Sequence, residues 1–146
     1  MARVDVLALQ GALSAAERGL PVTPSRGKRP VLTGWQDRGS TDQNQIRSWS
    51  REYSEVGYGV VVPAWLVVLD VDHDDLSGLP SSCALFVVRT PRPGWHLYFE
   101  LPDGMVRPRL RAPRAGIDVK GPGTLVMCPG SLHPKGGRYR WAALPS

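Results

Sequence analysis

The sequence predicts an α+β fold, with a mostly antiparallel sheet and helices covering one of its faces. Two observations lead to this prediction. Helical spacing of apolar residues is confined to the first 53 residues, whereas from residue 57 onward the chain consists of short β-branched and aromatic runs separated by Gly and Pro. The 146 residues suffice for a compact core without disulfide or metal cross-links. We therefore expect residues 1–146 to form a single domain.

Two helices are expected in the first third of the chain. Residues 5–18 form the first helix, and Gly19 is placed to end it as a C-terminal cap. Its apolar stripe consists of Leu9, Ala12, Leu13 and Ala16. The second helix begins at Thr41 or Asp42, either of which can cap it, and runs to about Tyr53. The core is expected to hold Ile46 and Trp49 from this helix and, further along, Trp65.

Short strands are expected along the rest of the chain. They are the segments 20–24, 57–63, 64–72, 84–90, 94–100, 116–121, 124–130 and 137–141. Pro63 and Ala64 separate two of them, which predicts a hairpin of 57–63 and 64–72 joined by a tight turn. A Gly-, Pro- and Arg-rich loop fills residues 25–40.

Charge narrows the class of partner. Lys and Arg outnumber Asp and Glu by 18 to 13, which makes a polyanionic partner plausible without demanding one. The basic residues gather in 107–114 and 135–140, while the acidic residues between them concentrate at the end of segment 64–72. An acidic point among basic flanks suits a metal site that handles phosphates.

The N-terminus and the cysteines indicate a cytoplasmic protein. Asp5 and Glu17 interrupt the first apolar residues, which suits neither a signal peptide nor a membrane span. Cys83 and Cys128 lack the spacing of a zinc site. We expect both cysteines to be reduced and buried.

The segment Leu66–Asp75, LVVLDVDHDD, reads as a buried strand that ends in four aspartates around one histidine. Because side chains alternate along a strand, Asp70 and Asp72 point to one face and repel each other unless a proton or a cation lies between them. Mg²⁺ or Mn²⁺ would suit this oxygen pair. The alternative is that the acidic cluster only solubilises a turn. We assign that turn role to His73, Asp74 and Asp75.

Two further strands alternate between apolar and polar side chains. The apolar set is Trp95, Leu97, Phe99, Ile117 and Val119, and the polar set, expected on a solvated face, is His96, Tyr98, Glu100, Asp118 and Lys120. If the polar faces align, Asp70, Asp72 and Asp118 converge as a three-carboxylate metal site with His96 nearby. Taken singly, a strand Asp is more often merely exposed, and a lone His is more often structural.

Two Gly-rich stretches flank these strands, TPRPGWH at 90–96 and the segment 120–141. Small residues let backbone amides approach a phosphate closely, and Lys120, Ser131 and His133 add donors. Hairpin turns are the simpler interpretation, although a turn can serve both purposes.

The order of these motifs, LDVD, RTPRPGWHLYF and GIDVKGPGTLVMCPGSLHPKGGRYRW, resembles the primase–polymerase (prim-pol) domain of the archaeo-eukaryotic primase superfamily. That domain occurs at the N-terminus of replication proteins of phages, plasmids and integrated elements. The resemblance covers nearly the whole chain. It implies a catalytic core similar to an RNA-recognition-motif sheet, here compact and without a zinc-binding insert.

The resemblance also implies roles for individual residues. Asp70, Asp72 and Asp118 would be the metal ligands, for two Mg²⁺ or Mn²⁺ ions, and His96 a catalytic contact to the triphosphate. Further contacts to the nucleotide would come from Gly94, Lys120, Ser131, His133 and Lys28. The positions expected to bind nucleic acid are Arg29, Trp35, Arg107, Arg109, Arg111 and Arg114.

The activity implied is that of a DNA primase and DNA polymerase, which transfers nucleotides from (d)NTPs to a 3′-hydroxyl on a single-stranded DNA template. It would operate in the cytoplasm of a bacterial host, with a fused or separate helicase and no membrane partner. Two alternatives remain open. A metal-dependent nuclease or phosphoesterase would give hydrolysis products, and a non-catalytic single-stranded nucleic-acid-binding module, using exposed aromatics such as Trp35 and Tyr139, would bind without the aspartates.

Overall fold

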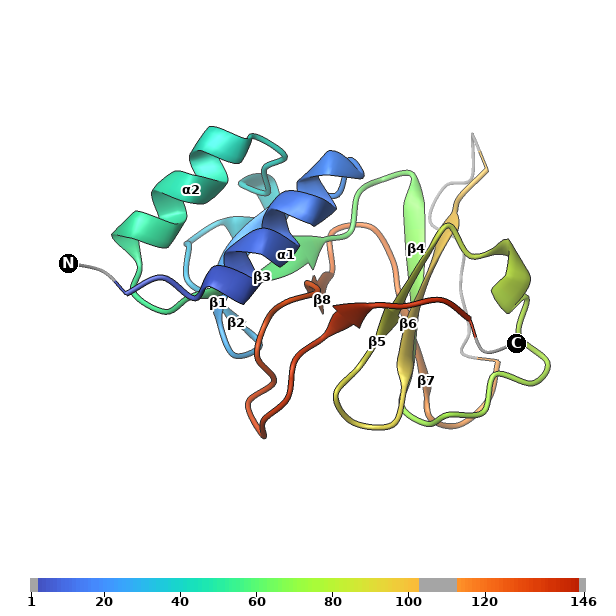
Figure 1. Cartoon of the computed structure of the whole chain (residues 1–146). Helices are drawn as coiled ribbons and strands as arrows, with labels where there is room; N and C mark the ends of the chain where they lie inside the picture. Colours follow the sequence, from blue (N-terminus) through green and yellow to red (C-terminus); the bar gives the residue numbers. More distant parts are fainter. Residues whose placement is uncertain (1–2, 103–112, 145–146) are drawn as a thin grey trace.

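The computed structural model describes residues 3–102 and 113–144, and these form two sheets with two α-helices packed on one side (Figure 1). The first sheet has the strand order β2-β1-β3-β8, and the second has the order β7-β4-β6-β5-β9. All described strand pairs are antiparallel. The predicted α+β class is therefore confirmed.

The strands of the first sheet are β1 at Val22–Arg26, β2 at Arg29–Pro30, β3 at Gly57–Val61 and β8 at Leu125–Met127. Those of the second sheet are β4 at Leu66–Val71, β5 at Phe86–Arg89, β6 at Trp95–Glu100, β7 at Ile117–Lys120 and β9 at Arg140–Trp141. Short 3₁₀ turns occupy Trp35–Asp37 and Ser81–Cys83.

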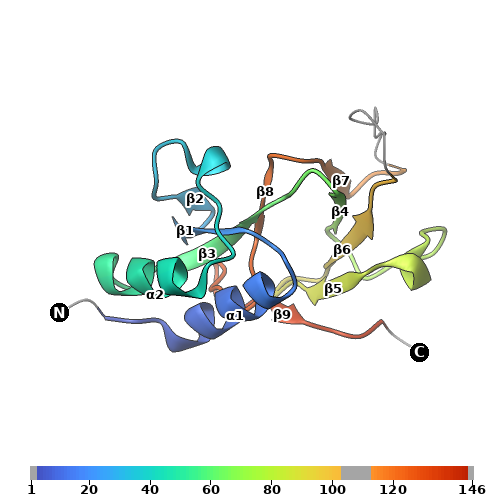
Figure 2. The same ribbon diagram turned by 90° about the horizontal axis from the view of Figure 1, so that it is seen from above.

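The predicted hairpin of 57–63 and 64–72 is wrong, because β3 and β4 belong to different sheets. Both edges of β3 are already used, by β1 and β8, and both edges of β4 by β6 and β7. The link between them turns at Pro63, whose carbonyl accepts a hydrogen bond from the Leu66 amide at 3.2 Å. Figure 2 shows the two sheets side by side with this link passing between them.

Helix α1, Val6–Glu17, begins and ends as the sequence predicts. The Asp5 carboxylate accepts a hydrogen bond from the Ala8 amide at 3.1 Å, and Gly19 takes a left-handed conformation, with φ of 79°, just past the helix. Its buried face is built of small residues, namely Ala8, Ala12, Ala15 and Ala16, with Leu9 and Leu13 only partly buried. Small side chains let the helix backbone lie directly against the 129–130 turn, where a Cβ on Gly11 would be 1.6 Å from the Pro129 oxygen.

Helix α2, Gln43–Glu52, is capped by Asp42, which accepts from the Asn44 amide at 2.9 Å, and it ends before Tyr53. Ile46 and Trp49 are buried against α1 and the first sheet, as predicted. In the described residues no helix is both long and apolar enough to cross a membrane.

One large apolar cluster joins the helices to both sheets. It contains Val22, Tyr58 and Val60 from the first sheet and Leu66, Val68 and Tyr98 from the second. A smaller cluster lies on the other face of the second sheet: Val71, Trp95, Leu97 and Ile117. The second sheet is therefore covered on both faces over much of its area.

Three expectations about burial are wrong. Tyr98, expected on a solvated face, is completely buried, because the first cluster covers that end of the sheet. Trp65, expected in the core, is 40% exposed in the link after β3, and Cys83, expected to be buried, is exposed in a 3₁₀ turn. Cys128 is buried and both thiols are free, as predicted.

Candidate active site

Three predicted site residues lie in one row across the second sheet. Asp70 on β4 is directly opposite His96 on β6 and directly opposite Asp118 on β7. Residues opposite each other in an antiparallel sheet project to the same face, so the carboxylates and the imidazole share it. Val68 and Tyr98, one step along the same face, belong to the core. The row thus lies where the covered part of this face gives way to solvent, and we name it the catalytic row after the role that the sequence predicts for it.

Asp72 continues this face beyond the end of β4. Its amide donates to the Gly116 carbonyl at 2.8 Å, which extends the pairing of β4 with the chain leading into β7. Asp72 and Asp118 are exposed, whereas the Asp70 side chain is 35% exposed. After Asp72 the chain bends away: Asp75 caps its own turn through the Ser77 amide, and Asp74 pairs with Arg89. The turn roles predicted for these two aspartates are confirmed.

The pKa of Asp70 is shifted by its surroundings. Burial alone would raise its pKa, but the His96 hydrogen bond and charge, together with the positive charges of Lys120 and Lys28, outweigh burial and hold the pKa below its usual value. The His96 Nε2 lies 3.4 Å from the Asp70 Oδ1. Lys120 follows Asp118 on β7, and Lys28 lies in the turn between β1 and β2. Residues from both sheets therefore act on one carboxylate.

An aromatic stack supports His96 from the side of the β8–β9 connection. The rings of His96 and Tyr139 are 5.6 Å apart and stacked, and His133 lies 5.9 Å beyond Tyr139. His96, expected on a solvated face, is only 4% exposed because this stack covers it, and Tyr139 is likewise buried. Burial, followed by the negative charge of Asp70, raises the pKa of Tyr139 to about 12, so its phenol stays neutral. The expectation of an exposed Tyr139 that stacks on bases is therefore wrong, since its ring is buried against the rings of His96 and His133.

His133 faces basic surroundings. Burial, then the charges of Lys28, Arg92 and Lys135, lowers its pKa, which favours the neutral ring near pH 7. Its Nδ1 accepts a hydrogen bond from the Lys135 amide at 3.0 Å. In the neutral ring the proton is therefore on Nε2, which makes that atom a donor suited to a phosphate oxygen.

A glycine is required at position 94 because the backbone there passes very close to the end of β4. A Cβ there would lie 2.3 Å from the Val71 carbonyl oxygen and 2.9 Å from the Thr90 Oγ1. The absence of a side chain lets the turn before β6 lie against the end of β4, which brings the start of the histidine strand next to Asp72. A role for Gly94 is thus explained by packing of the site's backbone.

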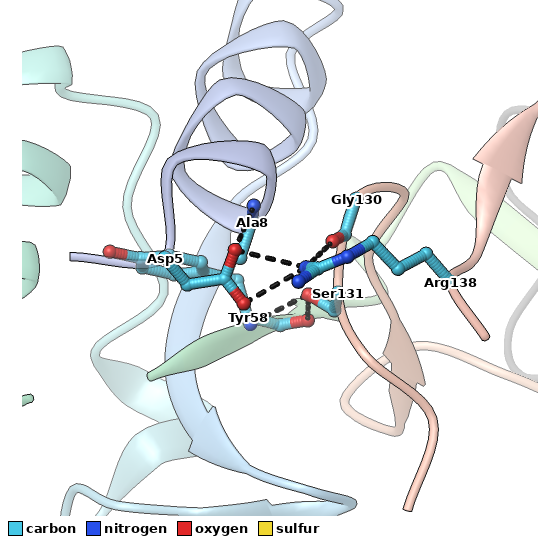
Figure 3. Close-up of polar contacts among 6 residues, drawn as sticks. All are labelled: Asp5, Ala8, Tyr58, Gly130, Ser131 and Arg138. Carbon is cyan, nitrogen blue, oxygen red and sulfur yellow. Dashed lines mark hydrogen bonds and ion pairs between the residues drawn. The ribbon is translucent and has the colours of Figure 1, made fainter. Parts of the chain in front are cut away.

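Ser131 has a structural position, which corrects its expected place in the nucleotide site. It is completely buried, and its hydroxyl accepts from the Tyr58 amide at 2.9 Å and donates to the Tyr58 carbonyl at 3.0 Å (Figure 3). With both functions used inside the protein, the hydroxyl has no remaining role at the surface. Ser131 instead fastens the β8–β9 connection to β3.

Figure 3 also shows a second fastening, which no pattern in the sequence predicts. The Arg138 guanidinium donates to both oxygens of Asp5 at 2.9 Å and to the Gly130 carbonyl at 2.8 Å. Asp5 thus caps α1 and holds the segment that carries His133 and Tyr139. The two partners are 133 residues apart, and no local pattern links them.

The residues expected to bind nucleic acid are scattered. Arg29 is exposed on β2, and Trp35 is half buried against the larger cluster. Arg114 donates to the backbone carbonyls of Ser77 and Asp75, so it stabilises the turn after β4. Three further arginines, Arg107, Arg109 and Arg111, lie outside the described residues.

The donor chemistry of the catalytic row fits a hard divalent cation. Asp70 and Asp118 are like charges directly opposite each other, an arrangement that is destabilising unless a cation lies nearby. Among residues 3–102 and 113–144, however, no three or more His, Cys, Asp or Glu side chains form a group that could hold a metal ion, so Asp70, Asp72 and Asp118 do not converge into one three-carboxylate site as predicted. Mg²⁺ commonly binds through one or two carboxylates, with substrate phosphates and water as the other ligands, so an open carboxylate set is compatible with it.

A cavity of about 610 Å³ lies beside His133. It is lined by Gly27, Gly57, Met127, His133 and Pro134 together with the start of α1. It adjoins the turn that carries Lys28. The carboxylates themselves lie outside it on the open face of the sheet.

The fold and the catalytic row define a class of protein: an α+β domain that gathers carboxylates, an imidazole and lysines at one end of a sheet, a set suited to phosphate chemistry. The family model described as "Bifunctional DNA primase/polymerase, N-terminal" matches residues 12–145. The chain therefore belongs to this Prim-Pol family, which confirms the resemblance inferred from the motifs. Membership supports a DNA primase/polymerase function, and thus a nucleotidyltransferase type of enzyme, at the level of the family. No curated protein matches the chain.

Proposed function

We propose that the chain catalyses template-directed nucleotidyl transfer from (d)NTPs to a 3′-hydroxyl on single-stranded DNA, with Mg²⁺ or Mn²⁺ as cofactor. The observation that carries this proposal is the catalytic row, with Asp118, Asp70 and His96 opposite one another on three strands. In the reaction the 3′-oxygen forms a bond to the α-phosphorus while the bond to pyrophosphate breaks. No covalent intermediate with a side chain is needed, so positioning and charge neutralisation carry the catalysis.

The acidic residues have the task of holding the cations. Asp70, Asp72 and Asp118 supply carboxylate oxygens, and the low pKa of Asp70 favours its ionised form. A divalent ion bound there would neutralise charge on the triphosphate and on the attacking oxygen.

The cationic and imidazole groups have the task of holding the triphosphate. The charges of Lys120 on β7 and of Lys28 in the β1–β2 turn both act on Asp70, and we assign to these two lysines the contacts to a triphosphate bound to the carboxylate-held cations. The His96 Nε2 lies 3.4 Å from the Asp70 Oδ1 at the same place, and the Nε2–H of neutral His133 adds a donor. Tyr139 keeps the His96 ring in position by stacking.

The test is nucleotide incorporation by the purified protein with Mn²⁺ or Mg²⁺, single-stranded DNA and labelled (d)NTPs, with and without a primer. We expect product from the wild type and a loss of at least about 100-fold in Asp70→Asn and Asp118→Asn, as for other groups that stabilise transition-state charge. Asp37→Asn, an exposed carboxylate in a 3₁₀ turn, is the matched control and should retain activity.

The outcomes discriminate between the remaining classes. Synthesis without primer means a primase, and synthesis only with primer means a polymerase. Shortened DNA with no dependence on (d)NTPs would replace the proposal by a nuclease. Binding of DNA that survives in both aspartate variants, with no synthesis by the wild type, would replace it by a binding module.

A further inference from the structure

A second basic site lies outside the catalytic row. Four arginines line a cavity of about 410 Å³: Arg89, Arg92, Arg138 and Arg140. They come from the end of β5, from the turn before β6 and from the segment that leads through β9. The remaining lining is the rest of the 90–93 turn and Gly137, and it contains no acidic residue. We name this cavity the arginine pocket.

The pocket is held open by packing between two turns. The Arg92 Nη2 donates to the Lys135 carbonyl at 2.7 Å, which braces one turn against the other. Gly137 approaches Pro91 so closely that a Cβ would lie 2.7 Å from the Pro91 ring. Within the turns, the Thr90 hydroxyl donates to the Arg92 carbonyl at 2.6 Å, and the His133 amide donates to the Gly137 carbonyl at 2.8 Å. The shape therefore exists before a ligand binds.

Charge in the arginine pocket is only half compensated. Arg89 has Asp74 at 2.6 Å and lies over the Trp95 ring, and Arg138 has Asp5 at 2.9 Å. In residues 3–102 and 113–144, neither Arg92 nor Arg140 has a carboxylate within ion-pair distance. Arg89 and Arg140 are moreover directly opposite on β5 and β9, which places like charges side by side. An anion in the pocket would relieve this repulsion.

The position of the pocket relates it to the catalytic row. Arg89 pairs with Trp95, whereas the adjacent pair is Val88 with His96, so Arg89 lies one residue along from the catalytic row and projects to the opposite face of the sheet. The chain around Arg138 connects the two regions, because Gly137 and Arg138 line the pocket and Tyr139 stacks on His96. A strand leaving the catalytic row over the β5–β9 edge would bring its phosphates to the pocket.

We propose that the arginine pocket binds backbone phosphates of the single nucleic-acid strand on which the catalytic row acts. Arginine suits this ligand because its planar guanidinium can donate two parallel hydrogen bonds to one phosphate. The inference deepens the proposed function, on which it rests for the identity of the strand. It assigns strand binding to residues other than the arginines of 107–114.

The test measures how affinity for a labelled single-stranded oligonucleotide depends on salt. Each phosphate contact contributes about 0.7 to the slope of log K against log salt for a single strand. Arg92→Gln/Arg140→Gln should therefore lower the magnitude of the slope by about 1.4, and Arg140→Gln alone, which breaks none of the hydrogen bonds named above, by about 0.7. The matched control Arg47→Gln/Arg51→Gln removes the same charge from exposed positions of α2 and should leave the slope unchanged. Equal slopes in wild type and pocket variants, or equal falls in pocket and control variants, would overturn the proposal.

Two further measurements distinguish strand binding by the arginine pocket from binding of free polyphosphate and from failure of the proposed function. Inorganic tripolyphosphate should bind the wild type and the double pocket variant equally. If the variant lost tripolyphosphate binding but kept oligonucleotide binding, the pocket would be a site for free polyphosphate, and the proposal would be overturned. Asp70→Asn should keep the wild-type slope. If the wild type synthesises no DNA but the pocket variants still lower the slope, the proposed function fails and the pocket stands. If synthesis proceeds and the slopes are equal, only the pocket fails.

Discussion

Replacing Ser131 by alanine distinguishes a structural serine from a nucleotide ligand. The substitution removes the acceptor of the Tyr58 N–H, which is buried. The Tyr58 carbonyl keeps a partner, because the Cys128 amide also donates to it at 2.9 Å. The expected cost is therefore that of one orphaned buried N–H, about 1–3 kcal/mol. At roughly 4 °C per kcal/mol for a chain of this size, Tm should fall by roughly 4–12 °C.

The assay is urea unfolding followed by circular dichroism, together with the KM for (d)NTP at a temperature where the variant is folded. Ser48→Ala, on α2, is the matched control and should change stability by no more than about 0.5 kcal/mol. We expect Ser131→Ala to lose stability with KM unchanged. Wild-type stability combined with a raised KM would refute the structural assignment and return Ser131 to the nucleotide site.

Three other substitutions test the site. Gly94→Ala should destabilise the fold by about 1–3 kcal/mol or more, because a backbone oxygen lies 2.3 Å from the new Cβ. The control Gly121→Ala, whose Cβ has no atom within 4 Å, should be neutral or should stabilise the fold by up to about 1 kcal/mol. Thermal unfolding of both variants measures the difference. Tyr139→Leu should lower kcat/KM by about 2- to 10-fold through loss of the stack on His96, and Tyr139→Phe should restore it, so an equal loss in both variants would contradict the positioning role. Because folding lowers the pKa of His133, the unfolded chain binds more protons than the folded chain below about pH 6.5. The difference in free energy of unfolding between the wild type and His133→Gln should therefore favour the wild type most above that pH and should shrink as acid is added. An advantage that grows with acid, in denaturant titrations across this range, would contradict the pKa direction.

Local signals in the sequence determined both α-helices and most strands, and they singled out the residues of the catalytic row. Asp42 and Gly19 mark helix boundaries because capping depends on a few adjacent residues. The alternation along β4, β6 and β7 placed Asp70, His96 and Asp118 each on the polar face of its own strand, since side-chain direction in a strand is a property of neighbouring residues. The order of the motifs was enough to indicate the family.

Tertiary structure alone decided which parts of those faces are open. Tyr98 shares a face with His96 but is buried, because the helices and the first sheet cover that end of it. Ser131 reads as a loop donor until Tyr58, 73 residues away, is found to use its hydroxyl. The meeting of Lys28 with Asp70 and of Asp5 with Arg138 likewise joins distant segments. Burial and partner choice depend on contacts between residues far apart in the chain, and local pattern carries no information about them.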